Sequence, residues 1–387
     1  MKFLHTADWH LGRYFHGASL LDDQAHVLDE FVRLAQDERV DAVVIAGDVY
    51  DRAVPPGDAV SLLGEVLERL VVHAGIPVIL IAGNHDSAER IGFGGRILER
   101  QKLFVRGGLG DFTPVVLRGE RGTAGDVAFH PLPYVEPVYA RTLAGGEGVT
   151  DHASAMASVL ARIRSGFEAG RPNVLVGHAF VAGGSESESE RPLTVGGSGM
   201  VPADAFSGFD YVALGHLHRP QSAGAPHVRY SGSLLKYSFQ ESQHDKGVSV
   251  VRVAAGGGCE VEHVRLSPRR DVRVMRGSFD ELRQAAAADP ARSDYLCAEL
   301  TDTTPVLESM VRLRELYPHL MEIRFQRQDA AGVHGARASG DHRRRDPADL
   351  FQSFWRDVAG EDIGLLQLEA FQGCAQSIVA GREEGAP

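Results

Sequence analysis

Four short runs of consecutive apolar residues constrain the fold of this chain more than any other feature of its sequence. They cover residues 43–46, 78–82, 174–176 and 211–214. Continuous β-branched runs are typical of strands buried on both faces, because neither face then carries polar side chains. Amphipathic helical patterns lie between the runs, for example at residues 57–73. The sequence therefore predicts an α/β protein with layered sheets flanked by helices.

The pattern changes after the strand–helix region, which covers residues 1–267. Residues 268–328 read as strand, helix, strand, helix, strand, and they predict a small α/β unit that carries no chemical motif. Residues 329–346 are rich in Gly, Ala, Arg and His and indicate a linker. Residues 347–387 contain two amphipathic patterns that predict a helical pair. Such a pair has little core of its own, so it either packs on a partner or folds back on its own chain.

Composition narrows the class of protein. The formal net charge of -12, from 52 acidic and 40 basic residues, argues against a surface that binds nucleic acid everywhere. The three cysteines, Cys259, Cys297 and Cys374, are far apart, so they fit neither a zinc ribbon nor a disulfide framework. No apolar stretch precedes the first charge and no run of about 18 apolar residues occurs, so we expect a cytoplasmic protein without a membrane span.

Metal-binding side chains follow the apolar runs. In open α/β folds, ligands bind beyond the carboxyl ends of strands, where the loops converge. Five strand ends that deliver carboxylate, imidazole or amide groups to one face would form a metal cage. The clusters contain Asp8 and His10, then Asp48 and Asp51, then Asn84, His85 and Asp86, then His178, and finally His216 and His218.

Each cluster alone also has an ordinary structural explanation. D-x-H can be a turn aspartate beside a core histidine, and G-D-x-x-D can be a helix cap. G-N-H-D reads as a tight turn, since Asn tolerates left-handed dihedral angles. G-H-x-H is stronger evidence, because alternate residues of an extended strand point the same way. All five together, each after an apolar run, favour a metal site over these separate explanations.

The order of the five motifs resembles that of the calcineurin-like metallophosphoesterases. Within that family, HTADWHLGR at residues 5–13 and YVALGHLHRPQ at residues 211–221 are similar to the SbcD exonuclease subunits of bacterial DNA-end processing. So are GGSESESERPLTVGGS at residues 183–198 and DPADLFQSFWRDVAGEDI at residues 346–363. Taken without the resemblance, the Ser/Glu-rich residues 183–192 predict a flexible surface loop.

The resemblance implies a metallophosphoesterase β-sandwich with an α/β capping domain, and it implies two metal ions. Two carboxylates leave about two positive charges of two divalent ions uncancelled, which suits a phosphodiester substrate. Nitrogen and oxygen ligands without thiolate favour a borderline metal, and the resemblance implies Mn²⁺. The implied ligands are Asp8, His10, Asp48 and His218 for the first ion, and Asp48, Asn84, His178 and His216 for the second, with Asp48 bridging.

The implied activity is that of a manganese-dependent DNA nuclease in DNA repair and recombination. It comprises 3′–5′ exonuclease action on duplexes and endonuclease action on single strands and hairpins. The implied partner is an SbcC-type ABC ATPase, bound through residues 347–387, within a heterotetramer that contains a homodimer of this chain. The helices near residues 57–72 and 88–101 would form the dimer contact. The chain has no G-x-x-x-x-G-K-[ST] phosphate loop, so ATP dependence has to come from the partner.

Two other functions compete with this interpretation. A metallophosphatase or phosphodiesterase could act on small phosphoesters or phosphoproteins, but Ala53 stands where those enzymes usually have Gly, and GNHD replaces their GNHE. A catalytically inactive scaffold is disfavoured because the ligand set is complete. Arg13, Arg52, Arg90 and Arg219 lie near the motifs, where they could contact phosphates or remain solvated.

His85 lies next to the ligand Asn84, and we predict that it points toward the substrate and stabilises the phosphate or the leaving oxygen. Asp51 or Asp86 is predicted to orient its ring. The substitution His85→Leu should leave the metal content unchanged and abolish phosphodiester cleavage. Metal analysis and a cleavage assay of the same sample measure the two effects. Cleavage by the metal-loaded variant would contradict this role.

Overall fold

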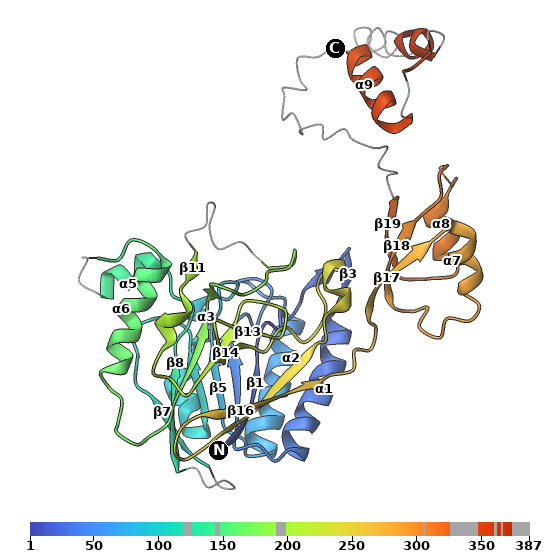
Figure 1. Cartoon of the computed structure of the whole chain (residues 1–387). Helices are drawn as coiled ribbons and strands as arrows, with labels where there is room; N and C mark the ends of the chain where they lie inside the picture. Colours follow the sequence, from blue (N-terminus) through green and yellow to red (C-terminus); the bar gives the residue numbers. More distant parts are fainter. Residues whose placement is uncertain are drawn as a thin grey trace, which may run out of the picture. The chain divides into compact units, whose positions relative to one another are not determined.

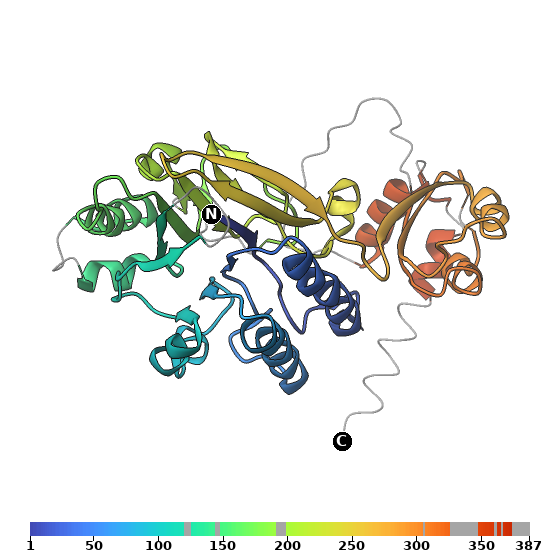
Figure 2. The same cartoon turned by 90° about the horizontal axis from the view of Figure 1, so that it is seen from below.

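The computed structural model describes residues 1–119, 125–143, 148–190, 199–304, 306–325, 347–359, 362–364 and 367–373. The chain divides into two compact units, Met1–Gln326 and Arg327–Pro387. In the larger unit, two six-stranded sheets lie between two groups of helices (Figures 1 and 2). The layered α/β fold predicted from the sequence is confirmed.

The first sheet has the strand order β16-β15-β1-β4-β5-β6. Strands β1, β4, β5 and β6 are parallel, whereas β15 and β16 form an antiparallel hairpin at the edge. Helices α1 and α2 connect the parallel strands, and α2 continues into a π-helical turn at Arg69–His73. The bounds are β1 Lys2–Thr6, α1 Leu21–Asp37, β4 Ala42–Ala46, α2 Gly57–Glu68, β5 Val78–Ile81, α3 Ala88–Ile91, α4 Gly95–Leu98, β6 Leu103–Arg106, β15 Gly247–Val253 and β16 Cys259–Arg265.

The second sheet has the strand order β13-β14-β12-β9-β8-β7. Its four inner strands are parallel and its two edge strands are antiparallel. Two-stranded ladders formed by β2 with β3 and by β10 with β11 lie in the connecting loops. The bounds are β2 Tyr14–Phe15, β3 Ala18–Ser19, β7 Val115–Arg118, β8 Asp126–Pro131, α5 Pro137–Leu143, α6 His152–Arg164, β9 Asn173–His178, β10 Phe180–Val181, β11 Met200–Val201, β12 Tyr211–Gly215, β13 Gln221–Ala223 and β14 Ala225–Tyr230.

Both faces of the central strands β4, β5, β9 and β12 are buried, which explains the continuous apolar runs. In β4, Val43 and Ile45 pack in the cluster beneath α1 and α2, whereas Val44 lies in the cluster between the sheets. The rings of Phe3 and Phe129 meet edge to face in that central cluster, with centroids 5.2 Å apart. A third cluster joins the second sheet to α6. The fold thus needs apolar residues at consecutive positions of its central strands.

A small unit of three parallel strands follows the β15–β16 hairpin of the first sheet, in the predicted strand–helix order (orange in Figure 1). Its own core lies around α7 and α8. Tyr295 also packs in the cluster of the first sheet, and its hydroxyl donates to the buried Asp23 at 2.8 Å. Arg270 donates to the same carboxylate at 3.2 Å. The bounds are β17 Val272–Gly277, α7 Phe279–Ala285, β18 Tyr295–Leu300, α8 Ser309–Arg314 and β19 Leu320–Phe325.

The second compact unit contains helix α9, Pro347–Ala359. Residues 367–373 are also helical, and the rings of Phe351 and Phe371 stack with centroids 3.9 Å apart. The helical pair is therefore present, although the part of the second helix expected beyond residue 373 lies outside the described residues. The domain boundaries after residues 267, 328 and 346 stay predictions. No helix of the described chain is long and apolar enough to span a membrane.

Val127 and Val116 form a matched test of the buried core. Val127 in β8 is fully buried, whereas Val116 on the neighbouring strand β7 is 41% exposed. Val127→Ala removes two buried methyl groups, at about 0.8 kcal/mol each plus a cavity term, so it should lower the free energy of unfolding by roughly 2 kcal/mol. Val116→Ala should change it by less than about 0.5 kcal/mol. Denaturant titrations measure both values, and equal losses would contradict the assigned burial.

Candidate metal centre

The predicted metal-binding residues meet at one edge of the two sheets. Strands β1, β4 and β5 of the first sheet are parallel, so their carboxyl ends lie together, and the same holds for β9 and β12 of the second. Hydrogen bonds connect the strand ends of the first sheet with those of the second. The Nδ1–H of His178 donates to the carbonyl of Ala46 at 2.9 Å, and the amide of His216 donates to Asp8 Oδ1 at 2.9 Å. The site therefore lies across both sheets.

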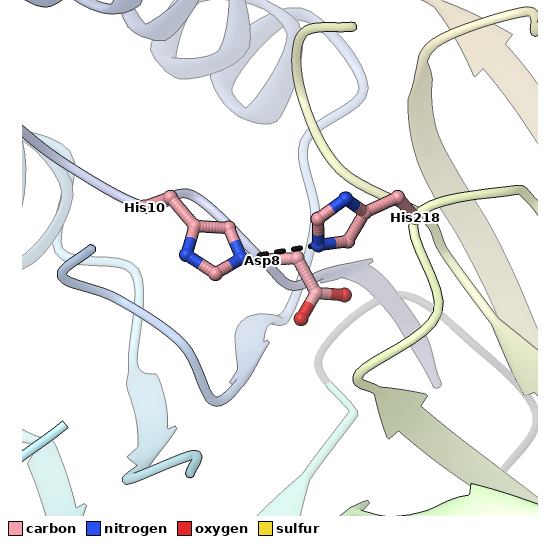
Figure 3. A group of neighbouring side chains, drawn as sticks. All are labelled: Asp8, His10 and His218. Carbon is pink, nitrogen blue, oxygen red and sulfur yellow. Dashed lines mark hydrogen bonds between the residues drawn. The ribbon is translucent and has the colours of Figure 1, made fainter. Parts of the chain in front are cut away.

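Asp8, His10 and His218 form the first cluster, and all three are buried (Figure 3). The two imidazoles face each other, with His10 Nε2 and His218 Nε2 3.1 Å apart. Two nitrogens that each lie about 2.1 Å from one ion, at nearly right angles, are about 3 Å apart. This spacing fits two ligands of a shared cation.

Asn84, His178 and His216 form a second cluster with Asp48. Asn84 Oδ1 lies 2.9 Å from His178 Nε2 and 3.3 Å from His216 Nδ1. Asp48 Oδ2 lies 3.5 Å from His178 Nε2 and also 3.7 Å from His10 Nε2 of the first cluster. Asp48 is thus placed between the two clusters, where a bridging carboxylate has to be.

Four of the seven predicted ligands have left-handed backbone conformations. The φ angles are 54° at Asp8, 45° at His10, 49° at Asp48 and 109° at His216. Side chains other than glycine rarely adopt such angles, and each costs on the order of 1–3 kcal/mol. Strain concentrated at one set of neighbouring residues persists only where the surrounding structure enforces it, and it typically marks a functional site.

The glycines of the motifs make room for the ligands. A Cβ atom on Gly83 would collide with the side chain of Asp48. A Cβ atom on Gly215 would collide with the carbonyl of Ala46 and approach His178 Nδ1 to 2.8 Å. The glycine that precedes the ligand in G-N-H-D and in G-H-x-H is therefore required by the closeness of the other strand ends.

The charges of the site fit bound cations. Burial, together with the neighbouring Asp48, raises the pKa of Asp8 well above its ordinary value. Burial likewise lowers the pKa of His10 and of His216 well below the usual range, which leaves neutral imidazoles. Nearby cations stabilise buried carboxylates, and a neutral imidazole can bind a cation through its unprotonated ring nitrogen, so the residues fit the implied metal pair.

His85 lies beside these clusters and is held by a backbone group. Its Nδ1–H donates to the carbonyl of Asp51 at 2.9 Å, and its Nε2 lies 4.0 Å from Asp48 Oδ2. The carboxylate of Asp51 instead faces Arg13 at 3.3 Å. The carboxylate of Asp86 accepts the amides of Val49, Tyr50 and Gly83 at 2.9–3.1 Å. The orienting roles of Asp51 and Asp86 stay predictions, since the group that contacts the ring is the Asp51 carbonyl.

The structure also adds residues that sequence reasoning missed. Ser189 Oγ lies 2.6 Å from His218 Nδ1, and Glu190 is 8% exposed. The prediction of a surface position is therefore wrong for Glu190, whereas the neighbouring Glu188 is exposed as expected. Behind Ser189 lies the buried pair Glu241 and Lys246. Gln24 donates to the carbonyl of His10 at 2.8 Å and holds that loop from α1. In the sequence, only the family resemblance of residues 183–198 could have indicated that residues 187–190 belong to the site.

The arginines near the motifs differ in their surroundings. Arg13 is paired with Asp51 and lies 4.8 Å from the ring centre of Tyr237. Arg52, Arg90 and Arg219 are exposed, so these three are accessible to an anionic ligand.

Comparison with known proteins identifies relatives along almost the whole chain. Residues 1–220 match the family model of calcineurin-like phosphoesterases, and residues 268–359 match that of the type 5 capsule protein repressor C-terminal domain. The SbcD subunit of the nuclease SbcCD from Staphylococcus saprophyticus is 34% identical over 364 residues, which are 94% of this chain and 94% of that protein. Its counterpart from Staphylococcus epidermidis is 31% identical over 369 residues, which are 95% of this chain and 96% of that protein.

A solved structure, that of TT1561 of Thermus thermophilus, matches 68% of this chain and 99% of its own at 15% identity. Its TM-score of 0.39 is too low to carry a structural argument.

Gly83→Ala should lower the amount of bound Mn²⁺ per chain, because the added methyl group displaces the side chain of Asp48. Gly64→Ala is the control, since a Cβ there meets no atom within 4 Å and the residue lies within α2. It should keep the wild-type metal content and gain about 0.5–1 kcal/mol of stability. Metal analysis after dialysis measures the number of Mn²⁺ ions bound per chain. Full metal content in the Gly83 variant would show that Asp48 does not need this space.

Proposed function

Because this chain belongs to the calcineurin-like phosphoesterases and, within them, to the family of the SbcD subunits of the nuclease SbcCD, we propose that it is a manganese-dependent DNA nuclease. As a member of that family it is a nuclease of the phosphoesterase type. The observation that carries the proposal is the meeting of Asp8, His10 and His218 with Asp48 and His178 at one buried edge. The experiment at the end of this subsection tests whether the metal is manganese and whether the substrate is DNA.

The proposed division of ligands follows the two clusters. One ion would be held by Asp8, His10, Asp48 and His218, and the other by Asp48, Asn84, His178 and His216. The 3.1 Å spacing of the Nε2 atoms of His10 and His218 and the intermediate place of Asp48 support this assignment. When bound, two such ions activate water and stabilise the attacking and leaving oxygens of an in-line displacement.

His85 is the proposed proton-handling group beside the ions. Its Nδ1–H is engaged by the Asp51 carbonyl in either protonation state, so a proton can be exchanged with the substrate only at Nε2. A protonated Nε2 can donate to a phosphate oxygen or to the leaving oxygen. The carbonyl of Asp51 keeps the ring in one orientation, and Asp86 holds the loops after β4 and β5 through its three amide contacts.

Exposed apolar side chains support the proposed homodimer. Phe93 is 84% exposed, Ile97 75% and Val72 67%, and all three lie in or beside the helices expected to form the contact. Large apolar side chains left exposed would be covered if these helices packed on a second copy of the chain. DNA would then be cleaved by two copies of the chain within the same complex.

The C-terminal segment is the proposed binding site for an SbcC-type ABC ATPase. The name of the relatives describes them as one component of the SbcCD nuclease. Helix α9 has apolar residues on one face, and its Phe351 stacks on Phe371. In this proposal residues 1–267 are the nuclease domain, residues 268–328 cap it and residues 329–346 link it to the ATPase-binding helices, in a cytoplasmic, nucleoid-associated complex.

The substrate is tested by incubating the protein with end-labelled linear duplex, hairpin and single-stranded DNA, and separately with a phosphopeptide and a cyclic nucleotide. With Mn²⁺ we expect cleavage of the DNA substrates and loss of that activity on chelation, recovered when Mn²⁺ is restored. The His85→Leu variant serves as the control for a contaminating nuclease. Turnover of the phosphopeptide or the cyclic nucleotide without DNA cleavage would favour the alternative metallophosphatase function.

A further inference from the structure

Ser189 contacts the ring nitrogen of His218 that faces away from His10. The Ser189 hydroxyl oxygen lies 2.6 Å from His218 Nδ1, and the other ring nitrogen, Nε2, faces His10. The same hydroxyl is hydrogen-bonded to the carboxylate of Glu241. Ser189 therefore stands between a predicted metal ligand and a buried acid.

Which group donates in the hydrogen bonds of Ser189 with Glu241 and with His218 follows from which of these groups carries a proton. Glu241 is completely buried and its Oε2 lies 2.5 Å from Lys246 Nζ, so it is an ionised carboxylate that can only accept. The single proton of the Ser189 hydroxyl is thus donated to Glu241. The Ser189 oxygen then accepts the Nδ1–H of His218, and His218 Nε2 is left without a proton. An unprotonated Nε2 is the form of imidazole that binds a metal ion.

The backbone of His218 is held by the same group of residues. Its amide donates to Glu190 Oε1 at 2.7 Å, and its carbonyl accepts from Lys246 Nζ at 2.6 Å. Arg13 donates to the carbonyl of Ser189 at 3.1 Å and ties this residue to the loop after β1. The amide, carbonyl and ring of His218 are therefore all positioned by residues outside the five motifs.

We propose that Ser189, supported by Glu241 and Lys246, is a positioning residue that sets the tautomer of His218 and thereby the affinity of the first metal position. This inference rests on the proposed function, in which His218 is a metal ligand. It assigns a role to the segment Ser187–Glu190 that its polar composition does not suggest. A hydroxyl that merely filled space would contribute nothing to metal affinity.

Four variants separate the hydroxyl group from the shape of the side chain. Ser189→Ala removes the hydroxyl. Ser189→Thr keeps it, and Ser189→Val has nearly the shape of Thr without it. Ser185→Ala is the matched control, because Ser185 lies two residues before the segment Ser187–Glu190 but is exposed and uses only its backbone groups in its hydrogen bonds to Gln221.

The readout is Mn²⁺ binding, followed by the loss of the electron paramagnetic resonance signal of the free ion during titration. We expect the Ala and Val variants to bind one of the two ions about 10- to 100-fold more weakly, as is usual when the group that orients a ligand histidine is lost. The Thr variant and the Ser185→Ala control should bind both ions with wild-type affinity. Nitrogen chemical shifts of the His218 ring in the metal-free protein should show the Nδ1–H tautomer in the wild type and a mixture in Ser189→Ala.

Wild-type affinity in all four variants would overturn the inference, and so would equal weakening by Thr and Val, because shape would then be the cause. If Ser189→Ala does not fold, the Thr and Val pair decides the matter alone. Absence of Mn²⁺ binding by the wild-type protein would instead overturn the proposed metal centre itself.

Discussion

The structure depends on the contact between two sheets whose strand ends meet at one edge. The central cluster around Phe3 and Phe129 fixes the distance between the sheets. The hydrogen bonds from His178 to Ala46 and from His216 to Asp8 then fix their registration at the edge. Because each sheet contributes some of the ligands, a small shift of one sheet would separate the two halves of the site.

The features of this arrangement that destabilise the folded state are concentrated at the proposed metal centre. Buried carboxylates, neutral imidazoles and four left-handed ligand backbones would destabilise an ordinary core. Bound divalent cations would stabilise the buried carboxylates and would bind the ring nitrogens that face the clusters. The residues proposed to bind metal ions are thus also the residues for which the metal-free fold is least favourable, so metal binding would be linked to folding stability.

The elements of the fold could be predicted from the sequence because their causes are local. The run at residues 43–46 is apolar on both faces, and β4 is buried on both faces, so the pattern and its cause coincide. The glycine and asparagine of G-N-H-D likewise report a turn that begins within a few residues of the ligand. The clustering of Asp8 with His218 was predictable only from the joint order of the motifs.

Contacts between residues distant in sequence were harder to predict. Ser189 and Glu241 are 52 positions apart, and no spacing rule connects a polar loop to a short helix that follows β14. The orientation of the His85 ring by a backbone carbonyl was invisible for a similar reason, since every residue has a carbonyl. Side-chain identity alone predicted the carboxylates of Asp51 and Asp86 as partners, but it carries no information on backbone groups.

The sequence distances within the metal centre have a consequence for the synthesis of the chain. His10 and His218 face each other across 208 positions, and Lys246, which holds the carbonyl of His218, lies 28 positions further on. Domains fold as units once they have left the ribosome, and contacts between distant positions form late. A nascent or prematurely terminated chain that ends before β12 therefore lacks His216 and His218, two of the seven predicted ligands. Hydrolytic capacity arises only in molecules whose two sheets have both been made and docked, so translation itself delays the appearance of a nuclease.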